Sequence, residues 1–301
     1  MSAVKLAPGT AFLSLREQTW EVLLNRSHKH PLVVVSHPRS PGQEGSLEAD
    51  LHAAIAEQQL ELYYQPIVEV QRNEVTGFEA LMRWHHPVLG MVPPSTFIPL
   101  AEQTGLIVEM GAWALKEACQ EAFTWPEHIK VTVNLSSVQF EQGDLYKDIK
   151  DALSFSGLSP VRLELEITES LLLRDEAKTH KLLHKLRSLG VKISLDDFGT
   201  AYASLSYLRS FPFDKIKIDR TFIADLDNPN RKDCIAIINA VAELAKQMQM
   251  STVAEGVETL DQLKTVTVAG CEEVQGFYFS KPVPANGVKA VITGCRALLR
   301  V

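Results

Sequence analysis

The chain has 301 residues, 46% of them hydrophobic and 22% charged, which is the composition of an ordinary globular protein. Its formal net charge of −7 argues against a protein that holds long nucleic acid on a basic surface. No apolar stretch approaches the roughly 20 residues that span a bilayer, and the N-terminus lacks the order of a secretory signal. The four cysteines are isolated in the sequence, so we expect reduced thiols in a cytoplasmic protein.

The first part of the chain, residues 1–45, differs from the rest. It contains a candidate amphipathic helix near 12–24, a candidate strand at 31–35, and a stretch at 38–46 whose proline, glycine and serine are typical of a linker. A piece of this length is too short to build its own core. We therefore predict an N-terminal extension over 1–45, either the tail of an upstream domain or a segment docked on the main domain at 46–301.

Strand-like and helical stretches alternate from Ser46, a candidate helix N-cap. The first strands, at 60–70 and 75–84, are separated by a short turn that predicts an antiparallel hairpin. The other strands are expected at 129–135, 162–168, 191–195, 215–218, 252–254 and 273–277. The helices are expected near 95–103, 107–122, 175–188, 202–209, 232–248, 258–268 and 285–299. This alternation favours a parallel sheet with crossover helices, and the strands suffice to close a barrel whose chemistry lies at the C-terminal strand ends.

Acidic and amide side chains fall at or near the ends of these strands. They are Glu79, Asn134, Glu166, Asp196, Asp197 and Glu255. Because desolvating a carboxylate is costly, several at half-buried strand ends indicate one cluster of hard oxygen ligands, the kind that binds Mg²⁺ or Mn²⁺. The adjacent pair Asp196-Asp197 is the strongest signal, since two neighbouring carboxylates repel each other unless a cation lies between them. An inward-facing Glu166 would likewise need a positive partner.

Several of these residues have a structural alternative when each is taken alone. Glu79 and Arg83 share one face of a strand and could form a buried salt bridge, and Asn134 could be a turn residue. The pair of histidines His180 and His184, spaced i,i+4 on one helical face, could bind zinc. Without a third ligand in that helix, a solvated helix surface is the favoured interpretation.

Taken in order, the motifs between about 47 and 285 resemble the EAL domain of bacterial cyclic di-GMP phosphodiesterases. The triplet that gives the domain its name is Glu79-Ala80-Leu81, and Arg83 completes its extended form. The other matching motifs are Tyr64-Gln65-Pro66-Ile67, Asn134-Leu135-Ser136, Glu166-Ile167-Thr168-Glu169, Asp196-Asp197-Phe198-Gly199, Lys217-Ile218-Asp219, Glu255-Gly256-Val257-Glu258 and Gln275-Gly276-Phe277. A single triplet is a weak match, whereas ordered motifs over most of the chain are specific.

The resemblance implies a modified (β/α)₈ TIM-type barrel whose first strand runs antiparallel. It also implies hydrolysis of one phosphodiester of cyclic di-GMP to linear 5′-pGpG with two divalent ions, Mg²⁺ or Mn²⁺. The first ion is assigned to Glu79, Asn134, Glu166 and Asp196, and the second to Asp196, Asp197 and Glu255. The catalytic group comprises Lys217, Glu255 and Asp197. Lys217 would position or deprotonate the attacking water, and the resemblance leaves open whether a general base is needed.

The resemblance also implies substrate contacts and a loop anchor. The substrate-binding residues are Gln65, Leu81, Arg83, Asp219, Gln275 and Glu258, with Glu258 behind the direct contacts. Glu169 is expected to anchor the loop after the aspartate pair, where Ala201 and Ala203 replace a glycine and a serine of the family. If position 201 requires a positive φ, alanine adds about 1 kcal/mol of strain. A homodimer packed near this loop and an upstream sensory or cyclase domain in a longer parent protein are also implied.

Two other functions are alternatives. One is a receptor that binds cyclic di-GMP without cutting it and signals through its N-terminal segment; the altered loop favours it, and the complete ligand set opposes it. The other is an unrelated metal-dependent barrel enzyme of the aldolase or enolase type. That function explains a carboxylate cluster but not the ordered motifs.

Overall fold

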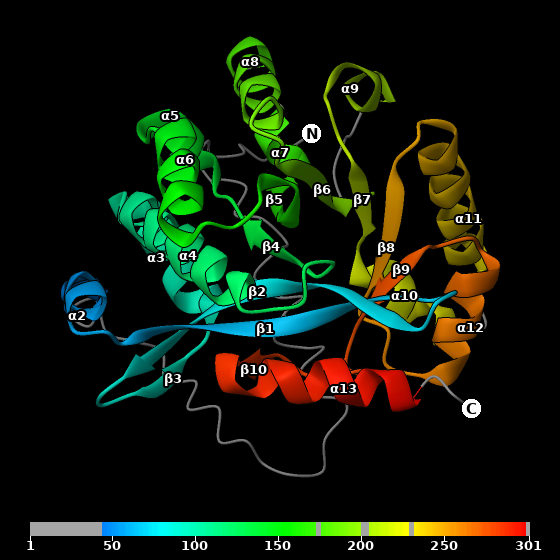
Figure 1. Cartoon of the computed structure of the whole chain (residues 1–301), viewed down its shortest axis with the longest axis horizontal. Coiled ribbons are helices and arrows are strands. Elements are labelled where there is room, and N and C mark those ends of the chain that lie inside the picture. The colour runs from blue at the N-terminus through cyan, green and yellow to red at the C-terminus, as the bar shows by residue number, and fades with distance from the viewer. Residues whose placement is uncertain (1–43, 173–175, 200–204, 229–231, 299–301) are drawn as a thin grey trace, which may run out of the picture. The chain divides into compact units, whose positions relative to one another are not determined.

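The computed structural model describes residues 44–172, 176–199, 205–228 and 232–298, and within them eight strands close a barrel (Figure 1). The barrel strands are β1 (Leu60–Glu69), β2 (Glu74–His86), β4 (Lys130–Asn134), β5 (Leu163–Thr168), β6 (Lys192–Phe198), β7 (Lys215–Ile218), β8 (Ser251–Glu255) and β9 (Glu273–Gln275). Strand β2 is parallel to β4, and each later barrel strand up to β9 is parallel to the one before it. Strand β1 is antiparallel to both of its neighbours, β2 and β9. The expected modified (β/α)₈ barrel with an antiparallel first strand is confirmed.

Two short strands extend the sheet beyond the barrel. They are β3 (Gly90–Val92), which pairs with the end of β2, and β10 (Val283–Pro284), which pairs with β1. The neighbour β4 pairs with β2 only over Gly77, Phe78, Glu79 and Ala80, and the rest of β2 continues outward as a hairpin. Glu79 therefore lies in the middle of β2 but at the end of the part that belongs to the barrel.

Helices cover the outside of the ring. They are α2 (Glu44–Ala56), α3 (Pro94–Thr104), α4 (Ile107–Phe123), α5 (Ser137–Gln142), α6 (Leu145–Ser156), α7 (Glu169–Leu172), α8 (Glu176–Arg187), α9 (Leu205–Ser210), α10 (Arg220–Ala224), α11 (Lys232–Gln247), α12 (Leu260–Val268) and α13 (Val288–Leu298). In Figure 1, α4 and α6 lie on one side of the barrel, α11 and α12 lie on the opposite side, and α13 runs along β1 and β2.

Within the described residues the predicted elements are present, with shifted ends. The N-cap prediction for Ser46 is wrong, because α2 begins at Glu44 and places Ser46 inside the helix. The last barrel strand ends at Gln275 rather than at residue 277, because the chain turns there and the Tyr278 amide donates to the Val257 carbonyl. At β6 the strand continues three residues past its predicted end at 195 and includes both aspartates. Helices α5, α6, α7 and α10 were not predicted.

The apolar core lies between the strands and the helices, and the inside of the barrel is polar. On β5, Leu163, Leu165 and Ile167 belong to the apolar core, while the alternating Glu164 and Glu166 are equally buried on the other face. Because side chains alternate along the strand, its apolar residues pack outward against the helices and its charged residues point into the barrel. An interior of this kind requires each buried charge to have a partner.

The remaining sequence expectations concern the ends of the chain and its thiols. The candidate helix, strand and linker before residue 44 lie outside the described residues, so the extension over 1–45 stays a prediction. Cys119, Cys234, Cys271 and Cys295 are buried and form no disulfide in the described part of the chain. In the described part of the chain, every helix is too short or too polar to cross a membrane.

Candidate metal centre

The inside of the barrel holds its charges in two layers, because alternate residues of a strand share a face. The lower layer, toward the N-terminal strand ends, is built around Lys215, whose Nζ lies 2.9 Å from Glu164 Oε1 and 2.8 Å from Glu273 Oε2. Thr76 donates its hydroxyl to the same Glu273 carboxylate. Burial alone would lower the pKa of Lys215, but the two carboxylates raise it, so the ammonium stays charged. This layer is satisfied within the protein and forms the floor of the site.

The upper layer lies two residues further along the strands and gathers four carboxylates around Lys217. The Lys217 Nζ contacts the carboxylates of Glu166 and Glu255, and lies 3.4 Å from Asp196 Oδ1 and 3.8 Å from Glu79 Oε2. Only 1% of the lysine is exposed. One ammonium therefore faces four carboxylates, and the layer carries an excess of negative charge when these are ionised.

The titration behaviour of the upper layer reflects this imbalance. Burial raises the pKa of Glu166 well above its usual value, although Lys217 opposes the shift. Burial also raises the pKa of Glu255 to about 8, with Asp196 and Glu79 adding to the shift. For Lys217 itself, burial would lower the pKa, but the surrounding carboxylates raise it well above its usual value. Both effects show that the layer favours additional positive charge.

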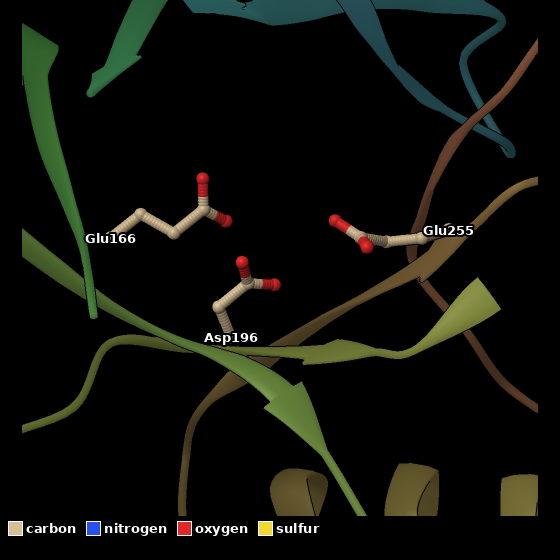
Figure 2. A group of neighbouring side chains, drawn as sticks. All are labelled: Glu166, Asp196 and Glu255. Carbon is tan, nitrogen blue, oxygen red and sulfur yellow. The ribbon is translucent and has the colours of Figure 1, made fainter. Parts of the chain in front are cut away.

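Three of the carboxylates converge on one space. Figure 2 shows Glu166, Asp196 and Glu255 pointing toward one another from separate strands, and one oxygen from each lies within 4.8 Å of the others. Among the described residues, Glu166 Oε2 is buried and accepts no hydrogen bond, and Asp196 Oδ1 faces only the Lys217 ammonium at 3.4 Å. Buried carboxylate oxygens without N–H donors are the ligands that hard divalent cations prefer. This donor set therefore fits Mg²⁺ or Mn²⁺.

The aspartate pair reaches the site through a distortion of β6. Its pairing with β7 shifts register between Leu195 and Phe198, and Asp197 has a φ of 55°, which is rare for a residue other than glycine. In a regular strand the adjacent side chains would point to opposite faces. Here Asp196 faces Lys217, while Asp197 shares a hydrogen bond with Asp219. Burial, followed by the charges of Asp196 and Asp219, raises the pKa of Asp197 to about 6.

Amide side chains hold Glu79 in place. Asn134 Nδ2 donates to Glu79 Oε1 at 2.6 Å, and Gln275 Nε2 donates to Glu79 Oε2 at 2.6 Å. Gln275 Nε2 also lies 3.2 Å from Gln65 Oε1, and Gln65 Nε2 donates to the Ser280 carbonyl at 3.3 Å. Both glutamines are buried. In this structure the two predicted substrate contacts Gln65 and Gln275 thus form part of the support of a predicted metal ligand.

The face of β1 and β2 continues from Glu79 toward the rim of the barrel. Tyr63 is paired with Leu81, and the Arg83 guanidinium lies 5.5 Å from the centre of the Tyr63 ring. Arg83 also donates to the Met82 carbonyl at 2.9 Å. Sequence reasoning missed Tyr63, although strand alternation places it on the same face as Gln65. These half-buried side chains form a surface with one cation and one aromatic ring next to the upper layer.

Two predicted residues lie at the edge of the site. Glu169 is 3% exposed and its Oε1 accepts a hydrogen bond of 2.9 Å from the Gly199 amide, so it holds the start of the loop after the aspartate pair. The substituted positions Ala201 and Ala203 lie outside the described residues. Glu258 is exposed, and its backbone amide donates to Gln262 Oε1 at 2.8 Å. Its expected place behind the substrate contacts stays a prediction.

The barrel with its inward carboxylates has a counterpart among protein families. The family model described as EAL domain matches residues 48–282. The chain belongs to the EAL domain family. Within this EAL domain, the motif Glu79-Ala80-Leu81 lies on β2 beside the upper layer.

Relatives of known name share this domain. The chain is 42% identical over 247 residues to the bifunctional diguanylate cyclase/cyclic di-GMP phosphodiesterase MucR of Pseudomonas aeruginosa, covering 81% of this chain and 36% of MucR. It is 40% identical over 258 residues to the cyclic di-GMP phosphodiesterase NbdA of the same organism, covering 84% of this chain and 33% of NbdA. A solved PaMucR phosphodiesterase in complex with c-di-GMP matches with a TM-score of 0.77 and 42% identity, over 81% of this chain and 99% of that one.

The EAL domain accounts for only part of these relatives. The chain spans about a third of the length of the curated relatives it matches, for example 36% of MucR and 33% of NbdA. The activity, ligands and partners of the whole protein are therefore proposals.

Proposed function

We propose that this EAL domain hydrolyses cyclic di-GMP to linear 5′-pGpG with the help of two divalent metal ions. The observation that carries this function is the upper layer, where buried carboxylates exceed the positive charge available from Lys217. The names of MucR and NbdA as cyclic di-GMP phosphodiesterases supply the substrate. An anionic chain can hold an anionic dinucleotide when metal ions provide the local positive charge.

The metal ligands of the proposal are the residues of the upper layer and its neighbours. Glu79, Asn134, Glu166 and Asp196 would hold one ion, and Asp196, Asp197 and Glu255 the other. When bound, such ions supply positive charge that lowers the pKa of an attacking water and offsets charge on the phosphate. Asn134 Nδ2 is used by Glu79, so its carbonyl oxygen is the atom left to act as a ligand.

The other roles in the proposed reaction belong to side chains of the protein itself. Lys217 has a raised pKa and stays an ammonium, so it donates to oxygens and offsets negative charge rather than removing a proton. Burial raises the pKa of Asp197 to about 6 without metal, so binding of the second ion near that pH would release the proton of this carboxyl. In the reaction the water oxygen bonds to phosphorus and the P–O3′ bond breaks. The water then contributes one proton to the 3′-hydroxyl, and the product keeps the 5′-phosphate.

The substrate would lie along the β1–β2 face. Arg83 is the cation of that face and can pair with a phosphate, and Leu81 offers apolar contact beside it. Gln65 and Gln275 act on the substrate mainly through Glu79, which they hold, and Asp219 acts through its bond with Asp197. Glu258 remains the more distant member of this group.

A turnover assay tests this function. The full chain is incubated with cyclic di-GMP and Mg²⁺ or Mn²⁺, and the nucleotides are separated by chromatography. We expect pGpG from the wild type, and no pGpG from Glu79→Ala or in the presence of EDTA. Intact cyclic di-GMP with both metals would refute the hydrolase. If calorimetry on that same sample showed tight binding, it would favour the receptor, whose motivating residues Ala201 and Ala203 lie outside the described part of the chain.

The proposed setting of the reaction follows the family resemblance. We propose a homodimer that acts in the cytoplasm, and an upstream sensory or cyclase domain in a longer parent protein. Four buried cysteines outside any disulfide agree with a reducing compartment. Light scattering at tens of micromolar measures the oligomeric state, and a monomer at that concentration would contradict the dimer.

A further inference from the structure

A second group of metal-binding atoms lies away from the barrel interior, on α8. His180 and His184 are separated by one helical turn, so their side chains lie on the same face of the helix. Their Nε2 atoms are 3.1 Å apart, and the ring centroids are 4.3 Å apart. A tetrahedral zinc ion with Zn–N bonds of about 2.0–2.1 Å separates two imidazole nitrogens by about 3.3 Å. The two nitrogens are therefore placed close to the separation that one shared cation requires.

A third donor atom comes from another element. The backbone carbonyl of Ser210, at the end of α9, lies 2.9 Å from His180 Nε2. The sequence alone gives no third ligand, because Ser210 is 30 residues from His180 and meets it only in the fold. Two imidazole nitrogens and a carbonyl oxygen thus converge from α8 and α9.

We propose that His180, His184 and the Ser210 carbonyl form a second cation site, selective for late first-row divalent metals such as Zn²⁺. Imidazole nitrogen is a preferred ligand for zinc, copper and nickel, whereas Mg²⁺ prefers oxygen. The ion would take the place of the Nε2 proton that His180 donates to the carbonyl, and the neutral ring would carry its proton on Nδ1 instead.

The position of the site gives a bound ion a structural consequence. Ser210 precedes β7 by only a few residues, and β7 carries Lys215 and Lys217 of the two layers. His180 also packs against Phe211, with ring centroids 5.5 Å apart. A cation shared by these groups ties α8 to the segment that leads into β7.

Zinc titration of the full chain in excess Mg²⁺ tests the proposal, because Mg²⁺ occupies the oxygen ligands of the barrel and leaves the imidazoles open. The variants are His184→Gln and His180→Gln, and the control is His128→Gln, which changes another exposed histidine. Calorimetry should show one more bound zinc ion for wild type and His128→Gln than for the two site variants. Equal zinc binding by the wild type and both site variants would overturn the proposal.

Hydrogen exchange provides a second readout that does not depend on turnover. Zinc should slow amide exchange in 205–211 of the wild type at least several-fold and leave it unchanged in His184→Gln. Thermal unfolding without zinc checks that the variants fold as the wild type does. Zinc bound equally by all proteins, with unchanged exchange in 205–211, would assign the ion to the barrel carboxylates and refute the histidine site.

Discussion

Replacing Lys217 by methionine tests the charge balance of the upper layer. The change keeps a long apolar side chain and removes the ammonium that lies 3.4 Å from Asp196 and 3.8 Å from Glu79. At an effective dielectric constant of about 20, a unit-charge pair at 3.4 Å interacts by about 5 kcal/mol. Partial protonation of the carboxylates limits the loss of stability. Without metal we therefore expect the free energy of unfolding to fall by about 3–5 kcal/mol, as for other broken buried ion pairs.

The same variant should respond strongly to metal. A divalent ion restores positive charge between the carboxylates. Saturating Mn²⁺ should therefore bring the free energy of unfolding of the variant to within about 2 kcal/mol of the wild-type value. The assay is urea unfolding of both proteins, in EDTA and in Mn²⁺. Turnover should still be lost in the variant, because it lacks the ammonium that we propose offsets negative charge on the phosphate.

A matched control lies one layer below. Lys215 is also buried and bridges Glu164 and Glu273, so Lys215→Met removes a comparable ion pair. We expect the free energy of unfolding to fall by a similar amount, roughly 3–5 kcal/mol, and Mn²⁺ not to restore it. Among the described residues, the three carboxylates that converge on one space lie in the upper layer, whereas the lower layer offers two, one of which also accepts from Thr76. This account of the two layers would be refuted if Lys217→Met lost as much stability with Mn²⁺ as without it. It would also be refuted if Mn²⁺ restored the stability of Lys215→Met.

Three further predictions follow from individual contacts. The pKa of Glu255 is about 8 in the folded protein and near 4.5 in the unfolded chain, so protonated Glu255 stabilises the folded state at low pH. This stabilisation is lost as the pH rises from 4.5 to about 8. In EDTA, the Tm of the wild type should therefore fall over that range by several degrees more than the Tm of Glu255→Gln. Gln275→Leu removes a donor from the carboxylate that it holds, and should weaken Mn²⁺ binding about 10–100-fold in calorimetry, whereas unchanged affinity would contradict its supporting role. Gly256→Ala puts a Cβ 2.6 Å from Arg220 Cβ at a φ of +73° and should cost about 1–3 kcal/mol in urea unfolding; Gly90→Ala, at a φ of +72° with open space, should cost less.

The acidic residues that gather in the barrel could be located from the sequence because carboxylates are unusual at the ends of apolar strands. Glu166 and the Asp196-Asp197 pair interrupt apolar runs, and the alternation of β5 correctly turns Glu164 and Glu166 inward. The position of Glu79 was harder to interpret. Its strand runs on past the barrel, so the end of the barrel segment is visible only from the pairing with β4.

Other features depend on contacts between distant residues. The hydrogen bond from Gln275 to Glu79 joins residues 196 positions apart, so the sequence suggested only a substrate contact for Gln275 and not its support of Glu79. The bulge that lets Asp196 and Asp197 serve one site comes from a register shift against β7. Helix α6 was missed although its signals are local, since Asp144 caps its start by accepting from the Lys147 amide and Gly157 ends it in the left-handed region.

The central claim is that the strand-end carboxylates of this EAL domain direct a water molecule onto a phosphodiester of cyclic di-GMP. Its most direct measurement is mass spectrometry of the product formed in ¹⁸O-labelled water with Mn²⁺. We predict pGpG that carries a single ¹⁸O atom on its 5′-phosphate, and no product from Glu166→Gln. Intact cyclic di-GMP from the wild type, or pGpG without the label on phosphorus, would contradict the account.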